Sequence, residues 1–588
     1  MNAERLLKVY EQISEAPDAI ARLRRFVLDL AVRGKLVEQD AADEPASELI
    51  GRLSAGKEQL VKAKVIKKPR VLGSDDELIR PYDIPVSWQW CRLDSVGAIV
   101  GGGTPSAGDS SNFETPGSGI AWLTPADLGG YAHLYISHGA RDLSDKGLSS
   151  SSATLMPTRS VLFTSRAPIG YVAIAENPIA TNQGFKSVVP FLSECSEYIA
   201  LTLKALATEI DAKASGTTFK EVSGKIVAGI PFPLPPLAEQ QRIVAKVDEL
   251  MALCDRLEEA RKTREEVRDK LTAASLARLT APDTSAEDFP THAAFALEAL
   301  PALTTRPNQI KTLRQTILNL AVRGKLVEQD PADEPASELL AREFALPEGH
   351  QRRRKILKEA AVDASKGLLT TLPKSWEYAR IQDLYDAKIL IDYADGNHGS
   401  LYPRKSEFGD VGVNFVSAKD LVDGRVNWAG CSKLNQKRAS QLTKGWAQTG
   451  DVLLTHNATV GRVARVPEKT DPFLLGTSVT FYRLNSQGIS PDYFFLVLLS
   501  PFWQDQLEAI MAQTTRNQVS IQKQAFFTVP VPPLAEQHRI VAKVDALMAL
   551  CDRLEAALTT TDTTRTRLLE ALLHEALEPA ANDLEAAQ

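Results

Sequence analysis

Residues 235–258 read PPLAEQQRIVAKVDELMALCDRLE, and residues 532–555 repeat this stretch as PPLAEQHRIVAKVDALMALCDRLE, with twenty-two of twenty-four letters identical. A second stretch is also duplicated, because AVRGKLVEQDAADEPASEL at 31–49 returns as AVRGKLVEQDPADEPASEL at 321–339. We call these four segments the frame blocks. The sequence that lies between them differs widely between the two halves. A duplication that keeps its frame and varies its inserts indicates a scaffold presenting two different binding surfaces.

The frame blocks at 235 and 532 predict two long helices with a hydrophobic seam. Apolar residues recur there at steps of four and three, which is coiled-coil spacing, and proline pairs mark the helix starts. We expect the first helix to span 237–279, roughly 60 Å at 1.5 Å per residue. Antiparallel packing of the two helices within one chain is favoured, with homodimerisation as the alternative. The seam positions, which would form the coiled coil, are Ile243, Val247, Leu250, Cys254 and Leu257, then Ile540, Val544, Leu547, Cys551 and Leu554.

The sequence predicts an α+β protein with a pseudo-twofold internal duplication. Both inserts carry short β-like runs separated by Gly, Pro, Asn and Ser turns, so we expect two strand-rich mixed domains joined by the long antiparallel coiled-coil helices. The expected regions are 1–80 (a helical segment with a basic linker), 81–234 (the first variable domain), 235–372 (a central region with the helix 237–279, a connection over 281–305 and a second helical repeat over 308–345), 373–531 (the second variable domain) and 532–588 (the C-terminal long helix).

Composition narrows the class of protein. The chain is 44% hydrophobic and 24% charged, and no run approaches the roughly 20 apolar residues of a membrane span. Its N-terminus lacks the apolar core of a signal peptide, so we expect a cytoplasmic protein without membrane association. The five cysteines form no metal-binding pair, and Cys254 and Cys551 lie on apolar helical stripes, which predicts buried thiols and no metal site. The net charge of −6 argues against non-specific coating of nucleic acid.

Motifs of catalysis are missing from the sequence. It contains no GxxxxGK[ST] phosphate loop, no HExxH metal motif and no GxSxG nucleophile elbow. The Asn-Pro dipeptide at 177–178 is followed by Ile and Ala, so the Asn-Pro-Pro-aromatic signature of amino-methyltransferases is absent. We therefore expect no catalytic residues.

Both variable domains instead carry small polar and cationic residues on loops rich in glycine. The first has GGGTPSAG at 101–108 and ATNQGFKS at 180–187, and the second has the weaker counterparts THNATVG at 455–461 and QTTRNQVS at 513–520. Glycine permits close backbone approach, and Arg, Lys, Asn, Gln, Ser and Thr contact phosphates and base edges. Ordinary turn chemistry is the favoured explanation for any single loop, and the recurrence of such loops in both halves narrows its margin over nucleic-acid contact.

At these residues the chain resembles the specificity subunit of type I restriction-modification systems. The resemblance lies in the frame blocks, in GGGTPS, TPADL and ATNQGFKS, and it spans residues 20 to 580. It implies two target-recognition domains that each read one half of a split DNA site. It also implies that the conserved helices set the spacer and dock methyltransferase subunits, while restriction and translocase subunits join the assembly. The chain itself would be non-catalytic and bind no cofactor, with S-adenosylmethionine, ATP and magnesium on the partner subunits.

Carried over position by position, the resemblance implies a set of DNA-binding residues. In the first domain these are Thr104, Ser106, Arg166, Gln183, Lys186, Thr218 and Lys220. The second domain departs more from the pattern, because it lacks the GGGTPS phrase and has Asn457 where the first has Arg166. Its implied DNA-binding residues are Lys419, Asn457, Arg462, Arg516, Asn517 and Gln518.

Two functions of other classes stay open from the sequence. A coiled-coil scaffold whose variable domains bind proteins would show the same duplication, and an enzyme such as a methyltransferase acting alone is the second alternative. Selection of duplexes from a random pool separates the first from a DNA reader, because a scaffold enriches nothing. Methyl transfer from S-adenosylmethionine by the isolated chain would support the second.

Overall fold

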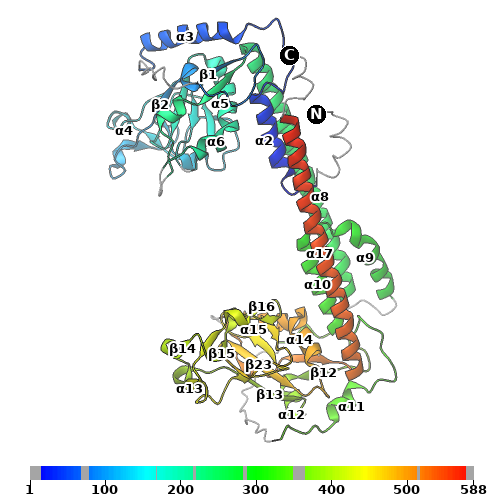
Figure 1. Cartoon of the computed structure of the whole chain (residues 1–588). Coiled ribbons are helices and arrows are strands. Elements are labelled where there is room, and N and C mark those ends of the chain that lie inside the picture. The colour runs from blue at the N-terminus through cyan, green and yellow to red at the C-terminus, as the bar shows by residue number, and fades with distance from the viewer. Residues whose placement is uncertain are drawn as a thin grey trace. The chain divides into compact units, whose positions relative to one another are not determined.

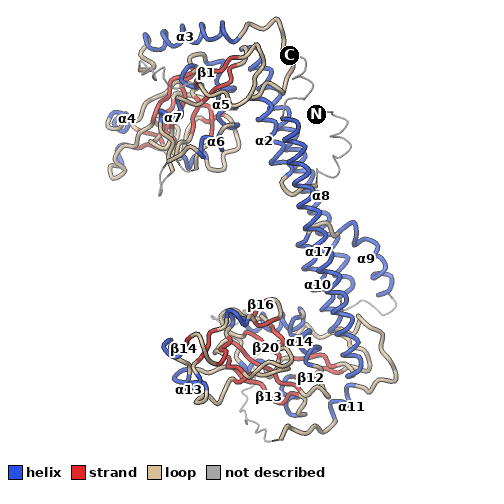
Figure 2. The backbone as a smooth tube through the Cα atoms, in the orientation of Figure 1, coloured by secondary structure: helices blue, strands red, loops and turns tan. Residues whose placement is uncertain are grey.

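The structure, a computed structural model, describes residues 15–67, 78–166, 168–215, 220–281, 288–348, 364–512 and 517–577. The chain divides into two compact units. Unit 1 comprises Met1–Thr263 and Asp562–Gln588, and unit 2 comprises Arg264–Thr561. Figure 2 shows that the strands lie in the two inserted segments. The frame blocks at 235–258 and 532–555 are helical from their third residue on, whereas those at 31–49 and 321–339 are helical only at their two ends.

Two helices of 44 residues each, α8 (Leu237–Thr280) and α17 (Leu534–Leu577), start directly after the proline pairs of the frame blocks (Figure 1). Each begins in one unit and ends in the other. At 1.5 Å per residue each is about 66 Å long.

A short frame helix accompanies the long helices in unit 1. Arg24 of α2 (Ala19–Val32) forms ion pairs with Asp255 and Glu258 of α8, while Arg261 reaches the carbonyl of Ala16, so α2 and α8 run antiparallel. The same α2 runs parallel to the end of α17, because Arg22 pairs with Glu570 and Lys35 donates to the carbonyl of Leu577. The long helix that leaves unit 1 and the one that enters it therefore run in opposite directions.

Unit 2 repeats this arrangement with α10 (Pro307–Val322). Arg314 of α10 pairs with Asp552 and Glu555 of α17, at the positions equivalent to Arg24 and its partners. The start of α10 pairs with the end of α8 through Arg306 and Asp269, and Leu320 shares a hydrophobic cluster with Leu276 and Leu279. The antiparallel course expected for the long helices is confirmed within each unit, and the structure adds a partner that the sequence did not indicate, the short helix.

A buried carboxylate anchors the start of each long helix. Glu239 accepts a hydrogen bond of 2.7 Å from Gln39 Nε2, and Glu536 accepts one of 3.0 Å from Gln329 Nε2 and another of 3.0 Å from Trp376 Nε1. One turn later, Arg242 pairs with Asp43 at 2.7 Å and Arg539 with Asp333 at 2.6 Å. Burial raises the pKa of both glutamates. The two kinds of frame block thus hold one another.

A glycine in each of the frame blocks at 31–49 and 321–339 packs against the first residues of the inserted domain that follows. Gly34 and Gly324 have φ of +66° and +67°, a left-handed conformation that ends α2 and α10. A Cβ at Gly34 would lie 2.4 Å from Pro85 Cγ, and one at Gly324 would lie 2.4 Å from Pro373 Cγ. The segments PVSW at 85–88 and PKSW at 373–376 are therefore packed against these frame blocks.

A pair of antiparallel strands closes each inserted domain. In unit 1, β1 (Gln89–Arg92) pairs with β11 (Pro231–Leu234), and in unit 2, β12 (Glu377–Arg380) pairs with β24 (Thr528–Val531). The first and last strands of each insert therefore lie side by side at the frame. The sequence between them is free to vary without moving the attachment.

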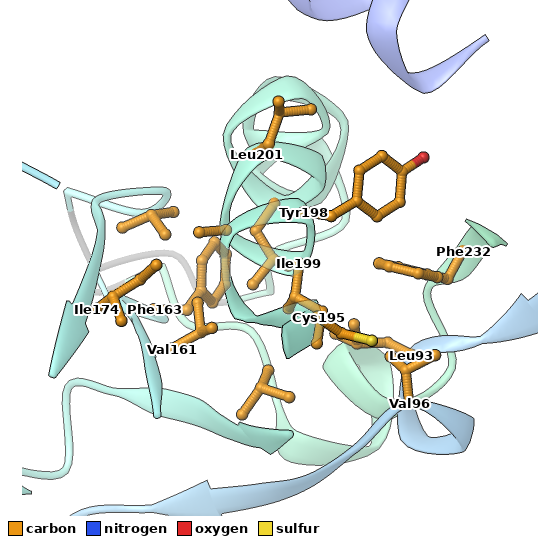
Figure 3. Close-up of a cluster of buried hydrophobic side chains, with 14 of the residues drawn as sticks. Leu93, Val96, Val161, Phe163, Ile174, Cys195, Tyr198, Ile199, Leu201 and Phe232 are labelled. Atoms are coloured by element: carbon orange, nitrogen blue, oxygen red, sulfur yellow. The ribbon is translucent and has the colours of Figure 1, made fainter. Parts of the chain in front are cut away.

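The first domain is built on a five-stranded sheet in the order β2, β10, β7, β8, β5. Helix α5 (Ser196–Ala205) packs on this sheet and on α2. The buried side chains on and around α5 include Phe163, Tyr198 and Phe232 (Figure 3). In that order, the sheet strands span Gly97–Gly101, Lys186–Pro190, Val161–Phe163, Val172–Ala175 and Tyr135–Ile136. The further strands are β3 (Phe113–Glu114), β4 (Ala121–Leu123), β6 (Asp142–Leu143) and β9 (Ile179–Thr181), and the further helices are α4 (Asp145–Ser149), α6 (Ala207–Ala212) and α7 (Gly224–Ala228). Helix α3 (Ala46–Lys62) precedes the domain in the chain.

The second domain contains two larger sheets. Strands β13 (Leu390–Asp395), β23 (Val479–Leu484), β20 (Val452–Thr455) and β21 (Val463–Arg465) form the one covered by α14 (Pro491–Leu499). The other sheet has the order β14 (Phe408–Gly409), β18 (Ser432–Leu434), β15 (Val413–Val416), β22 (Phe473–Leu475), β19 (Trp446–Ala447). The remaining strands of the domain are β16 (Leu421–Val422) and β17 (Arg425–Val426). Its further helices are α12 (Ile381–Asp386), α13 (Gln436–Ala439), α15 (Pro501–Met511) and α16 (Ile521–Gln524).

The predicted α+β class with two strand-rich mixed domains is confirmed. The expected connection over 281–305 contains a helix, α9 (Phe289–Leu303), which the prolines and threonines of this segment obscured. The two halves also differ after the first frame block, since α3 has 17 residues while its counterpart α11 (Ala336–Ala341) has 6.

Replacing Gly34 by alanine tests the contact between frame and insert. We expect Gly34→Ala to lower the free energy of unfolding of unit 1 by about 2–4 kcal/mol, because the new methyl group adopts a left-handed backbone and overlaps Pro85. The matched control is Gly51→Ala in the interior of α3, where an added Cβ meets nothing within 4 Å and should stabilise by about 0.5–1 kcal/mol. Urea denaturation of the full chain measures both, and equal midpoints for the two variants would contradict the packing role.

Candidate nucleic-acid interface

The candidate residues of the first domain gather where three neighbouring strands end. Strand β2 ends at Gly101, β7 ends at Phe163 and β10 starts at Lys186. Because β10 is antiparallel to both β2 and β7, these three ends lie at one edge of the sheet. We call this edge, with the loops that follow the strands, the loop edge.

The second domain forms an equivalent loop edge from different residues. Strand β13 ends at Asp395, β20 ends at Thr455 and β23 starts at Val479. Both β13 and β20 pair antiparallel with β23, so these ends also lie together. The strand registers make Lys186 equivalent to Thr480 and Gly101 equivalent to Asp395.

A charged cluster of three side chains occupies the loop edge of the first domain. Arg166 Nε donates to Glu221 Oε2 at 2.9 Å, and Lys186 Nζ donates to Glu221 Oε1 at 3.3 Å. The side chain of Arg166 is 43% exposed, that of Glu221 34% and that of Lys186 17%. Burial alone would raise the pKa of the Glu221 carboxyl, but the two cationic donors outweigh burial and lower that pKa. We call these three residues the Glu221 cluster.

Thr104 and Gln183 are brought together beside this cluster. The Thr104 hydroxyl donates to Gln183 Oε1, and both residues are exposed. The backbone passes very close here, since a Cβ at Gly102 would lie 2.0 Å from the carbonyl oxygen of Asn182. Gly102 of GGGTPS is therefore required by the contact between the two loops, and that contact presents Thr104 and Gln183 to solvent.

The remaining candidates of the first domain are placed less centrally. Ser106 is exposed, and its backbone carbonyl accepts a hydrogen bond from the Asn112 side chain. Lys220 is exposed and lies 3.5 Å from Asp211. Thr218 lies outside the described residues.

In the second domain, Asn457 and Gln518 take the places of Arg166 and Glu221. The backbones of Asn457 and Gln518 pair as an isolated bridge, as those of Arg166 and Glu221 do. Asn517 is exposed next to them, and its carbonyl accepts from Ala458 N. Arg516 lies outside the described residues.

Two cations of the second domain are engaged in internal contacts. Lys419 Nζ donates to Asp420 Oδ1 and to the carbonyl of Gly430, both at 2.7 Å. Arg462 Nη1 donates to the carbonyls of Ala418 and Leu421 at 3.4 Å. Both side chains therefore brace the segment 417–430, a role that the sequence did not indicate.

The structure also locates a counterpart of the GGGTPS phrase that the sequence missed. A Cβ at Gly396 would lie 2.1 Å from the carbonyl oxygen of Leu475, the same close passage that Gly102 makes. Counting from this glycine, His398 stands at the position of Thr104. The single shared glycine was too weak a signal without the strand register.

His398 belongs to a charged group with partly buried members. Its Nε2 lies 2.5 Å from Asp395 Oδ2, and Lys444 Nζ lies 2.6 Å from Asp395 Oδ1. Burial alone would raise the pKa of the Asp395 carboxyl, but its contacts with Lys444 and His398 outweigh burial, and the pKa is lowered overall. His456 is buried behind the loop edge, shares a 2.9 Å hydrogen bond with Thr480 Oγ1, and has its pKa lowered by burial to about 4.

The seam residues of the long helices are used inside their own units. Ile243 and Val247 belong to the hydrophobic core of the first domain and α2, and Ile540, Val544 and Cys551 belong to that of the second domain and α10. Leu250, Leu257, Leu547 and Leu554 are half-buried. The prediction of buried thiols is confirmed, since Cys254 and Cys551 are buried and burial raises both pKa values.

Neither a metal cluster nor a membrane span is found in the described parts of the chain. No group of three or more His, Cys, Asp or Glu side chains there is arranged to hold a metal ion. None of the described helices combines the length and the apolar character needed to cross a bilayer.

The family model for the type I restriction modification DNA specificity domain matches residues 85–266 and 373–561. These two matches cover nearly all of the first inserted domain, all of the second, and the first part of each long helix. The chain therefore belongs to the family of type I restriction-modification specificity subunits, and the resemblance seen in the sequence is confirmed.

Relatives of known identity match along nearly the whole chain. The specificity subunit of the type I restriction enzyme EcoAI from Escherichia coli is 27% identical over 95% of this chain and 94% of its own length. That of EcoEI, also from Escherichia coli, is 29% identical over the same shares. The crystal structure of the HsdS subunit from Thermoanaerobacter tengcongensis matches with a TM-score of 0.41 and 20% sequence identity. The match covers 84% of this chain and 98% of that subunit.

The buried His456 predicts a pH-dependent stability of the second domain. Its folded pKa of about 4 lies below the unfolded value near 6.5, so the unfolded state binds more protons between these values and stability falls as the pH falls through them. Acidification from pH 7 to pH 5 should cost about 2 kcal/mol through this residue alone. The matched variant is His456→Ser, because Ser165 stands at the equivalent position of the first domain. Denaturation at both pH values should show a smaller pH effect in the variant, and an equal pH effect would contradict the assignment.

Proposed function

We propose that the chain selects the DNA target of a type I restriction-modification complex, with each inserted domain reading one half of a bipartite site. One observation carries this proposal. Both domains assemble the same loop edge from the same strand ends, yet the side chains presented there differ, as Arg166 and Asn457 illustrate. A constant scaffold with different side chains at one equivalent edge is what two different half-sites require.

The residues at the loop edges have the chemistry of nucleic-acid contacts. Arg, Lys, Asn, Gln, Ser and Thr donate hydrogen bonds to phosphates and read base edges in the major groove. Exposed Thr104, Gln183 and Asn517 supply neutral donors and acceptors, and Arg166 and Lys220 supply positive charge. The net charge of −6 suggests that partner subunits add cations along the DNA.

The long helices are proposed to set the distance between the half-sites. Helices α8 and α17 each begin in one unit and end in the other, and each is tied to both units by ion pairs and apolar contacts. A change in their length would therefore change the spacer and leave the half-sites unaltered.

The chain is proposed to act without catalysis of its own. Methyltransferase subunits would dock on the frame, and restriction and translocase subunits would complete the assembly. S-adenosylmethionine, ATP and magnesium would be held by those partners, in keeping with the missing catalytic motifs of this sequence. The chain's partner on the substrate side is double-stranded DNA.

Selection from a pool of random duplexes tests this proposal. The full-length chain, assembled with its modification subunits, should enrich a motif of two short blocks separated by a fixed number of unspecified base pairs. Enrichment of no motif would refute DNA reading and favour a scaffold whose variable domains bind proteins.

A pair of matched insertions adds a sharper readout to the same selection. Three heptads, about 32 Å of helix, inserted after Thr263 in α8 and after Thr561 in α17 should lengthen the preferred spacer by about one DNA turn and preserve both half-sites. The control carries the insertion in α8 alone and should lose the bipartite motif, because the two helices then no longer reach both units in register. An unchanged spacer in the double insertion would contradict the role of the helices.

A further inference from the structure

The Glu221 cluster and its counterpart differ in charge at equivalent backbone positions. Arg166, Lys186 and Glu221 in the first domain correspond to Asn457, Thr480 and Gln518 in the second. Backbone contacts agree on both sides, since Ser165 N and His456 N donate to Gly184 O and Ser478 O. The two domains thus place a charged trio and a neutral trio in one structural context.

Glu221 holds Arg166 in a defined orientation. Its carboxylate accepts from Nε of Arg166, and the two terminal nitrogens of the guanidinium make no hydrogen bond to the described residues. Those two nitrogens carry the donors of the guanidinium fork, which matches the paired acceptors O6 and N7 of guanine. Lys186 supports this arrangement, because its bond to the other oxygen of Glu221 fixes the carboxylate.

The counterparts in the second domain match a different base. The side chains of Asn457 and Gln518 form no hydrogen bond to the described residues, and Gln518 is exposed. An amide offers one donor and one acceptor, which is the complement of adenine N7 and N6 in the major groove. None of Asn457, Thr480 and Gln518 carries a charge, and an amide, with one donor and one acceptor, matches the two acceptors of guanine less well than a guanidinium does.

We propose that Arg166 and Asn457 are base-reading residues at equivalent positions, Arg166 taking a guanine in the first half-site and Asn457 an adenine in the second. Glu221 is a positioning residue that acts through Arg166. This inference rests on the proposed function and deepens it, because it assigns a base class to one position of each half-site.

The first test is the Arg166→Lys variant of the whole chain, which is assembled with its methyltransferase subunits and used to select binding sites from a pool of random duplexes. Lysine keeps the positive charge and loses the fork, so preference for one guanine of the first half-site should fall by about 10- to 100-fold. The second half-site serves as an internal control for folding and should be unchanged. The assignment would be overturned if the variant lost preference at a base other than guanine, or if it lost preference at no base of the half-site.

The second test exchanges the pair between the domains. Arg166→Asn combined with Glu221→Gln places the side chains of the second domain in the first domain. The base position of the first half-site that favoured guanine should then favour adenine. Glu221→Gln alone should weaken preference for the same guanine, and a uniform loss of affinity for all sequences would refute its positioning role. Lys220→Ala removes a neighbouring exposed cation, and this comparison variant should weaken binding evenly without changing any base preference.

These outcomes separate the inference from the proposed function. If the unaltered chain enriches no bipartite motif, the proposed function fails, and the base assignment falls with it. If the unaltered chain enriches a motif and Arg166→Lys leaves the first half-site unchanged, only the base assignment fails.

Discussion

Each half of the molecule is assembled around a buried carboxylate at the start of its long helix. Glu239 and Glu536 lie where the helix, the preceding frame block and the inserted domain meet, and a buried charge without partners is costly. Changing Gln39 or Gln329 alone would remove a donor from such a carboxylate. The near-identity of the frame blocks follows from this mutual dependence, since both copies must keep the same set of donors, cations and close contacts.

Because the attachment is fixed, the inserts are free to change. Each domain enters and leaves through one pair of antiparallel strands, so insertions and altered sheets within it leave the frame undisturbed. The second domain uses this freedom to build a larger second sheet, and still returns its strand ends to the same loop edge. Variation therefore concentrates in the part of the molecule to which we assign recognition.

The sequence predicted those features that depend on periodicity and repetition. The seam of Ile243 and Val247, the proline starts and the strand-rich inserts all follow from local patterns, and α8 extends as far as those patterns suggest. Features that depend on contacts between distant segments were out of reach. The pairing of Arg166 with Glu221 joins residues far apart in the chain, and the equivalence of His398 with Thr104 becomes visible only through strand register. The sequence also could not show that Lys419 and Arg462 donate to backbone carbonyls of their own domain, because a lysine or arginine in a loop can equally face solvent.

We infer that the two inserted domains read DNA independently and that one duplicated frame holds both of them. A chain in which residues 81–234 replace residues 373–531 can be used to select its binding sites from a pool of random duplexes. Because the long helices run in opposite directions in both units, this chain should enrich the first half-site twice, as an inverted repeat with the original spacer. Retention of the second half-site, or enrichment of a direct repeat, would refute this arrangement.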